Sequence, residues 1–181
     1  MPITWTRNPE ADRLLEEEPL ALLIGLVLDQ QVKMEKAFSG PWELKRRLGA
    51  LNPREIAEMN PDDLDRVFRE RPALHRFPGS MARRVQELCR AVVHEYNGDA
   101  GAVWREARTG DELARRISKL PGFGDMKTKI TVAVLAKKFG VTPPGWEKQA
   151  AHWHTVADVE TEADMVQARE VKRAMKADKA Q

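Results

Sequence analysis

Prolines, glycines and capping residues divide this sequence into helix-length segments almost throughout. Asn52-Pro53 and Asn60-Pro61 each place a capping side chain before a proline at a first helical position. Pro19 follows three glutamates, and negative charge suits the N-terminal end of a helix dipole. No alternating five-residue run favours a strand, and no repeat period is present. The pattern predicts an all-α protein of nine or ten short helices.

Apolar spacing predicts where the longer helices lie. The first should run from about Leu20 to Phe38 and end before Ser39-Gly40-Pro41; its first half is apolar on all sides, so it should be the central buried helix. The remaining predictions are Ser80 to Tyr96, stopped by Asn97-Gly98; Asp111 to Ser118; Asp125 to Phe139, closed by Gly140; and a last helix that begins with a capping box of Thr161 and Asp164. Thr142–Gly145 should be a loop, and the polar end, Lys172–Gln181, should fray.

The composition is that of a globular protein large enough to bury a core. Of 181 residues, 42% are hydrophobic and 32% are charged, and the mean hydropathy is −0.54. We expect a helical domain over residues 1–145 and a helical extension over 146–181. The longest apolar run, Leu20–Leu28, is too short to span a bilayer, and no secretion signal is recognised. With Cys89 as the single cysteine, these features predict a cytoplasmic, nucleoid-associated protein with no metal site or cofactor.

Charge is unevenly distributed behind a net value of +2. Residues 1–30 are acidic, with six acids and two arginines, whereas residues 66–94 carry seven arginines against two glutamates. Residues 120–140 carry four lysines against one aspartate. The two basic segments could merge into one phosphate-binding face. The alternative is ordinary solvated helix surface.

The most informative motif is Leu120-Pro121-Gly122-Phe123-Gly124. Proline closes one helix, and two glycines allow a tight turn in which the backbone can approach a ligand closely. The amides of Gly122 and Gly124 would lie at the N-terminus of the next helix, which favours an anion such as a phosphate. Leu120 and Phe123 would anchor the turn, and the motif is the usual form of a helix-hairpin-helix DNA-binding element. The alternative is an αα-corner that uses proline and glycine only as helix boundaries.

Two lysines follow this turn. Lys127 and Lys129 lie about one helical turn further on and are expected to add phosphate contacts. Such contacts hold double-stranded DNA without reading its sequence.

Over roughly residues 18–145 the chain resembles the helix-hairpin-helix/Gly-Pro-Asp (HhH-GPD) superfamily of base-excision-repair DNA glycosylases, and in particular a short actinobacterial branch. Besides the turn, two segments carry the resemblance. Leu26–Val32, with Gln30-Gln31, is similar to an early helix whose glutamine pair lies near the lesion pocket of adenine glycosylases. The segment Pro72–Phe77, continuing into Met81–Arg84, is similar to the one that precedes the long helix ahead of the hairpin. The resemblance implies an HhH-GPD fold and a role in DNA repair.

The chain departs from the family pattern at three places. The essential aspartate is missing from the stretch after the second hairpin helix, Val141–Glu147; Glu147 and Asp158 are the next acids that could replace it. The Schiff-base lysine position is occupied by Met126, which cannot act as an amine nucleophile; Lys127, one residue later, would need a shift in helix register. The four cysteines of an iron–sulfur cluster are missing, since only Cys89 exists.

Three residues near the end of the apolar run are further candidates. Asp29 could face a pocket and perform acid/base work, or it could be an exposed acid. Gln30 and Gln31 could hydrogen-bond an extruded base or satisfy helix backbone groups.

These observations predict a monofunctional DNA N-glycosylase that acts on a damaged or mispaired base, with lyase activity disfavoured because of Met126. Asp29, Asp158 and Glu147 are the candidate catalytic acids. The first alternative is a non-catalytic DNA-binding protein that has lost the glycosylase aspartate. The second is a protein-interaction domain without a DNA role.

Overall fold

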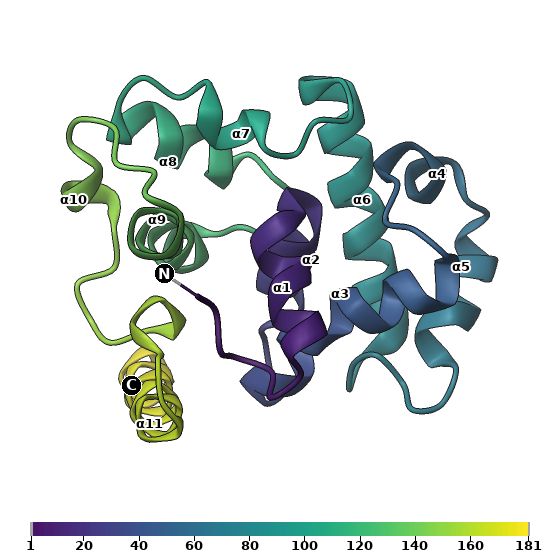
Figure 1. Cartoon of the computed structure of the whole chain (residues 1–181), viewed down its shortest axis with the longest axis horizontal. Coiled ribbons are helices and arrows are strands. Elements are labelled where there is room, and N and C mark those ends of the chain that lie inside the picture. The colour runs from purple at the N-terminus through teal and green to yellow at the C-terminus, as the bar shows by residue number, and fades with distance from the viewer. Residues whose placement is uncertain (1, 181) are drawn as a thin grey trace.

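The computed structural model describes residues 2–180 and is all-helical over that range, with no strand among those residues (Figure 1). In chain order the elements are α1 (Pro9–Glu17), α2 (Pro19–Leu28), α3 (Met34–Leu48), α4 (Pro53–Glu58), α5 (Pro61–Arg69), α6 (Pro78–Tyr96), α7 (Ala102–Arg105), α8 (Gly110–Ser118), α9 (Asp125–Phe139), α10 (Trp146–Gln149), the 3-10 helix η1 (Val156–Asp158) and α11 (Glu162–Ala180). The all-α prediction is confirmed, with somewhat more helices than expected.

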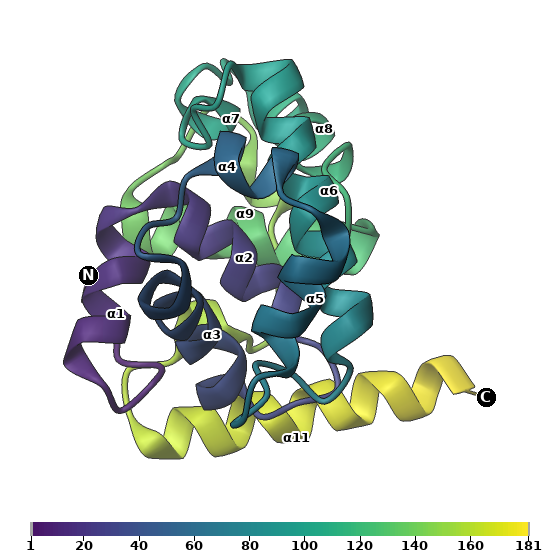
Figure 2. The same cartoon turned by 90° about the vertical axis from the view of Figure 1, so that its right-hand side faces the viewer.

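Helix α2 lies at the centre of the molecule, as predicted for its apolar sequence (Figures 1 and 2). All of its residues from Leu20 to Leu28 are buried, and it packs against α1, α3 and α6. Two glycines bring α2 and α3 close together. A β-carbon at Gly25 would lie 2.7 Å from the Phe38 ring, and one at Gly40 would lie 2.4 Å from Leu28. Both glycines therefore serve helix–helix contact, because any larger side chain would separate the two helices.

The prediction of one continuous helix from Leu20 to Phe38 is wrong. Helix α2 ends at Leu28, a short non-helical segment follows, and α3 begins at Met34. Gln31 adopts a φ of 57°, which interrupts the helix. Helix α3 then continues through Ser39-Gly40-Pro41, where the sequence suggested a stop. Gly40 is needed there for contact with α2, so packing overrides its usual helix-breaking effect.

Several predicted boundaries are confirmed in atomic detail. Asn52 accepts hydrogen bonds from the amides of Arg54 and Glu55, and Asn60 accepts one from Asp62. Asn97 and Gly98 end α6 with left-handed backbone angles.

Two predicted helix starts are wrong. Helix α6 begins at Pro78, so Ser80 lies inside it. Helix α8 is capped by Thr109, whose hydroxyl accepts from the amide of Glu112, and Asp111 lies in its first turn. In both cases another residue a few positions earlier meets the requirement for a helix start.

The C-terminal part of the chain folds onto the hairpin helices. Helix α10 packs on α8 and α9, and η1 packs on α9 and α11. The Thr161–Asp164 capping box is confirmed by reciprocal hydrogen bonds of 2.8 and 3.2 Å. Helix α11 reaches Ala180, and Gln181, the last residue of the segment expected to fray, lies outside the described residues. In Figure 2, α11 runs along the lower edge of the molecule.

Within residues 2–180, none of the helices combines the length and the apolar character needed to cross a membrane.

Candidate functional site

The glycine turn joins α8 to α9 at the protein surface. Leu120 and Phe123 are 4% and 3% exposed, and the Phe123 amide donates to the Leu120 carbonyl at 3.2 Å. Gly122 has a φ of +91°, a conformation that disfavours any residue with a β-carbon. Gly124 is exposed and has an ordinary φ of −77°. Two buried side chains thus hold a surface turn that is half-buried at Gly122 and exposed at Gly124.

The turn has the geometry of an anion site. Gly124 caps α9 without a side chain, and among the described residues no acceptor is found for the amides of Gly122 and Gly124. Exposed amides at a helix N-terminus attract negative charge. Asp125, the first residue of α9, lies exposed beside them, so its carboxylate competes for the same positive end of the helix.

The turn also lines a cleft of about 810 Å³. Its walls come from the end of α2 and the start of α3, the glycine turn and first turns of α9, the segment before η1, and one face of α11. Of the site residues predicted from the sequence, the cleft brings together Asp29, Gln30, Gln31, Gly122, Gly124 and Lys127.

Lys127 points inward instead of toward solvent at the turn. Its Nζ donates to the Leu26 carbonyl at 2.5 Å and lies 3.4 Å from the Asp29 carbonyl oxygen. The ammonium group therefore binds the C-terminal end of α2, where helix carbonyls lack partners. The phosphate contact expected from the sequence would require Lys127 to leave these carbonyls.

Burial lowers the pKa of Lys127 to about 8 from its ordinary value of 10.5. The positive charges of Lys172 and Arg84 act in the same direction, and Asp29 opposes them. A lysine with such a pKa holds a substantial fraction of neutral amine at slightly alkaline pH.

Asp29 ends α2, and its carboxylate reaches the cleft. The side chain is 14% exposed, and Lys172 on α11 lies 3.3 Å from one of its oxygens. The sequence left open whether Asp29 faces a pocket or is an exposed surface acid, and in the structure it faces the cleft.

The two glutamines differ. The Gln30 side chain donates to the Val27 carbonyl at 2.9 Å, so it satisfies helix backbone. The Gln31 side chain is exposed at the cleft margin and makes no hydrogen bond that the described residues record.

The other predicted site residues lie outside the cleft lining. Glu147 is exposed on α10. Lys129 is exposed on α9. Asp158 accepts from the Thr155 amide at 2.9 Å and from Lys137 at 2.5 Å. Burial alone would raise the pKa of Asp158, but these hydrogen bonds outweigh it and lower the pKa below its ordinary value.

Sequence reasoning missed His75, which fixes one wall of the cleft. Its Nδ1 accepts from the Phe77 amide at 2.9 Å, so Nε2 carries the proton of the neutral ring. Nε2 then donates to the carbonyls of Leu28 and Gln30, at 3.0 and 2.9 Å. Burial lowers the pKa of His75, which keeps the ring neutral. Its position within Pro72–Phe77, a segment already singled out by resemblance, was the available signal.

The two basic segments, residues 66–94 and 120–140, come together only in part. Arg84 of α6 lines the cleft, but Arg66 and Arg69 pair with Asp63 and Asp65 within their own helix. The larger group of cations at the cleft comes from α11, for which the sequence predicted only a polar end.

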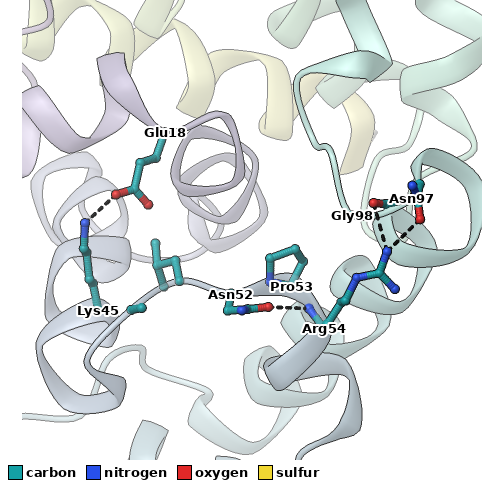
Figure 3. Close-up of a pocket in the computed structure, with 9 residues that line it drawn as sticks. Glu18, Lys45, Asn52, Pro53, Arg54, Asn97 and Gly98 are labelled. Atoms are coloured by element: carbon teal, nitrogen blue, oxygen red, sulfur yellow. Dashed lines mark hydrogen bonds and ion pairs between the residues drawn. The ribbon is translucent and has the colours of Figure 1, made fainter.

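A second hollow of about 460 Å³ lies between α3, α4 and the end of α6 (Figure 3). Its polar groups already have partners: Lys45 pairs with Glu18, and Arg54 donates to the Asn97 carbonyl and side chain at 3.1 and 2.7 Å. The Asn52 side chain caps α4. This hollow therefore offers a ligand few free hydrogen-bonding groups.

Within residues 2–180, no three histidine, cysteine or acidic side chains come together in an arrangement that could hold a metal ion.

An all-helical chain with an exposed glycine turn beside a charged cleft is a helix-hairpin-helix protein in its architecture. Residues 24–178 match the family model described as HhH-GPD superfamily base excision DNA repair protein. The chain belongs to this superfamily.

Among solved structures, the chain is similar to one described as "Structure of a Trapped Endonuclease III-DNA Covalent Intermediate: Estranged-Adenine Complex". The sequence identity is 23% and the TM-score is 0.49. The match covers 73% of this chain and 57% of that one, so the chain spans less than two thirds of that structure's length. A comparison with curated proteins found no match.

Proposed function

We propose that this protein is a base-excision-repair DNA N-glycosylase that holds double-stranded DNA at the glycine turn and receives a damaged or mispaired base in the adjacent cleft. One observation carries the proposal: Gly122 and Gly124, whose amides have no acceptor among residues 2–180, and Asp29 line the same cleft. An enzyme that acts on a base inside a duplex must first extrude it into such a pocket. The turn holds the backbone, and the cleft supplies the chemistry.

In this proposal Asp29 is the catalytic acid. Hydrolysis breaks the bond between C1′ and the base, and positive charge develops on the sugar before water adds its oxygen at C1′. The base departs with the bond's electron pair and takes up a proton. A fixed carboxylate stabilises the developing positive charge. Asp29 is favoured over Asp158 and Glu147 because it is the one of these three acids that lines the cleft.

Lys127 favours a second candidate chemistry. Its Nζ lies at the cleft, and its pKa of about 8 makes part of the population a neutral amine. Such an amine can add to the C1′ aldehyde of an abasic site and lose one water to form an imine. Lyase chemistry of this kind would follow base removal, and it does not depend on Met126.

The binding step is tested with Gly124→Val. A β-carbon at Gly124 meets no atom within 4 Å, and its φ suits any residue, so the fold should tolerate valine while the side chain blocks phosphate approach. We expect wild-type binding to a labelled duplex oligonucleotide to weaken with rising salt, and the variant to lose at least tenfold in affinity with unchanged thermal unfolding. Gly124→Ala, with a smaller obstruction, should lose less. Equal binding by wild type and Gly124→Val would contradict the proposed role of the turn.

The chemical step is tested by incubating the protein with duplexes that carry a panel of damaged or mispaired bases and measuring abasic product. Asp29→Asn should abolish product while retaining duplex binding. Borohydride reduction in the presence of an abasic duplex tests the second candidate, since it traps an imine on Lys127 in wild type and none in Lys127→Met. Tight binding without product from any duplex would support the alternative of a non-catalytic DNA-binding protein.

We also propose that the protein belongs to a short actinobacterial branch without an iron–sulfur cluster. It would lie in the cytoplasm, at the nucleoid. Its main domain would end at residue 145, where the C-terminal extension begins. Cys89 is the single cysteine in the sequence, and it is buried in α6.

A further inference from the structure

Helix α11 is attached to the rest of the protein mainly through its first half. Met165 and Ala168 are buried there. Arg169 pairs with Glu35 of α3, and Lys172 pairs with Asp29 at 3.3 Å. Beyond Lys172 every described residue is exposed except Met175, which is half-buried. The second half of α11 is therefore held out beside the cleft and is not buried against another helix.

That second half presents a row of cations. Arg173, Lys176 and Lys179 line the cleft and have no ion-pair partner among residues 2–180. At 3.6 residues per turn they fall, with Arg169 and Lys172, within an arc of about 120°. The two acids of this stretch, Glu170 and Asp178, lie outside that arc. A spacing of three residues places successive charges about 4.5 Å apart along the helix.

The cationic row lies at the same cleft as the glycine turn. Gly122 and Gly124 contribute to its lining, as do Arg173, Lys176 and Lys179. Two independent features that attract phosphate, free amides at a helix N-terminus and unpaired cations, therefore flank one opening. An elongated polyanion such as a nucleic-acid backbone can contact both at once, whereas a single small anion cannot neutralise the whole row.

An anionic membrane is the other surface that attracts a basic helix. Helices that lie on membranes carry a broad apolar face opposite the basic one. In α11 the apolar side chains Met165 and Ala168 are buried against the protein, and Val166 is the exposed large one. The helix therefore lacks the free apolar face that membrane binding requires.

We propose that Arg173, Lys176 and Lys179 of α11 bind phosphates of the DNA held at the glycine turn, so that the backbone of the bound strand lies between α11 and the turn. This assignment rests on the proposed function, because it presupposes that the turn binds DNA. It gives the interface a second phosphate-binding surface, on an element outside the hairpin.

The test is the salt dependence of binding to a labelled duplex that contains an abasic-site analogue. The variant Arg173→Gln/Lys176→Gln/Lys179→Gln keeps helix-forming side chains and leaves the ion pairs of Arg169 and Lys172 intact. Every phosphate that the variant no longer neutralises reduces the slope of log affinity against log salt by about 0.9, so the slope should fall by about 2 to 3. The control Arg13→Gln/Arg108→Gln/Lys148→Gln removes three exposed cations outside the cleft lining and should leave the slope unchanged.

The outcomes separate the two proposals. A wild-type protein that binds DNA, with an unchanged slope in the α11 variant, would overturn the role of α11 and leave the proposed function standing. A wild-type protein that does not bind DNA would overturn both. Phosphatidylserine vesicles provide the third arm: loss of vesicle binding in the α11 variant, with DNA binding unchanged, would identify α11 as a membrane-binding helix instead. Circular dichroism confirms that α11 remains helical in the variant.

Discussion

The cleft beside the glycine turn and the hollow between α3, α4 and the end of α6 contain similar kinds of residue, but those residues differ in whether they already have bonding partners. In the hollow between α3, α4 and the end of α6, the charged and amide side chains bind one another or cap a helix. In the cleft, burial lowers the pKa of the half-buried Lys127, and the turn amides and the side chains of Arg173, Lys176 and Lys179 lack partners among residues 2–180. The presence of polar and charged groups without partners, more than the presence of a hollow, therefore distinguishes a candidate site.

The largest expected effect comes from the buried charge of Lys127. The folded-state pKa of Lys127 is about 8, below the ordinary 10.5. At pH values between these two, Lys127 therefore carries a proton in the unfolded chain but has lost it in the folded chain. Folding stability should thus rise with pH across this window, by about 3 kcal/mol. Lys127→Met should lack this rise in denaturant unfolding measured at a series of pH values. Lys129→Met, at an exposed position, should keep it; identical pH profiles for all three proteins would contradict the burial of Lys127.

The wall of the cleft should be nearly as sensitive. His75→Leu removes the donor to two backbone carbonyls and should lower the free energy of unfolding by about 2 kcal/mol. Because burial lowers the pKa of His75, wild-type stability should also fall as the pH drops below 6.5, and this loss should be smaller in the variant. His94→Leu, at a highly exposed position, should stay within about 0.5 kcal/mol of wild type. Equal effects at both histidines would show that the His75 hydrogen bonds do not stabilise the wall.

In the second hollow, Asn52→Ala should cost about 1 kcal/mol, because the amides of Arg54 and Glu55 lose their capping acceptor. DNA affinity should not change. Asn52→Asp retains a capping oxygen and should retain most of the stability. A loss of DNA affinity in Asn52→Ala at full stability would mean that this hollow, too, contributes to binding.

The smallest effect is expected for the ion pair between Glu18 and Lys45, whose side chains are about one third exposed. Glu18→Gln should change the unfolding free energy by less than about 1 kcal/mol, and added salt should reduce the difference. A double-mutant cycle with Lys45→Gln measures the pair directly. A coupling well above this range would indicate that the hollow is held together by charge.

Local signals in the sequence were sufficient for most of the fold. The caps at Asn52 and Asn60, the stop at Asn97-Gly98 and the turn between α8 and α9 depend on residues close together in the chain, and all are confirmed. The continuation of α3 through Gly40 was missed because Gly40 and Leu28 act through their contact with each other. The helix propensity of a glycine is the same whether the glycine ends a helix or lies within one and lets another helix approach.

The candidate site was predicted in part for the same reason. The glycine turn and the Asp29–Gln31 segment are each continuous in sequence, and the cleft brings them together. The inward orientation of Lys127 depends on the end of α2, about a hundred residues earlier in the chain. His75 and the cations of α11 likewise acquire their roles from distant neighbours, so no short window of sequence identifies them.

Cys89 has a practical consequence for these experiments. It is the single cysteine in the sequence, it is fully buried in α6, and burial raises the pKa of its thiol to about 12. Alkylating reagents attack the thiolate, so the native chain should resist labelling while it is folded. A cysteine introduced at the exposed Asp178 would then be the only thiol that a fluorophore can reach. Emission from that position would follow the approach of α11 to DNA without first requiring a cysteine-free background.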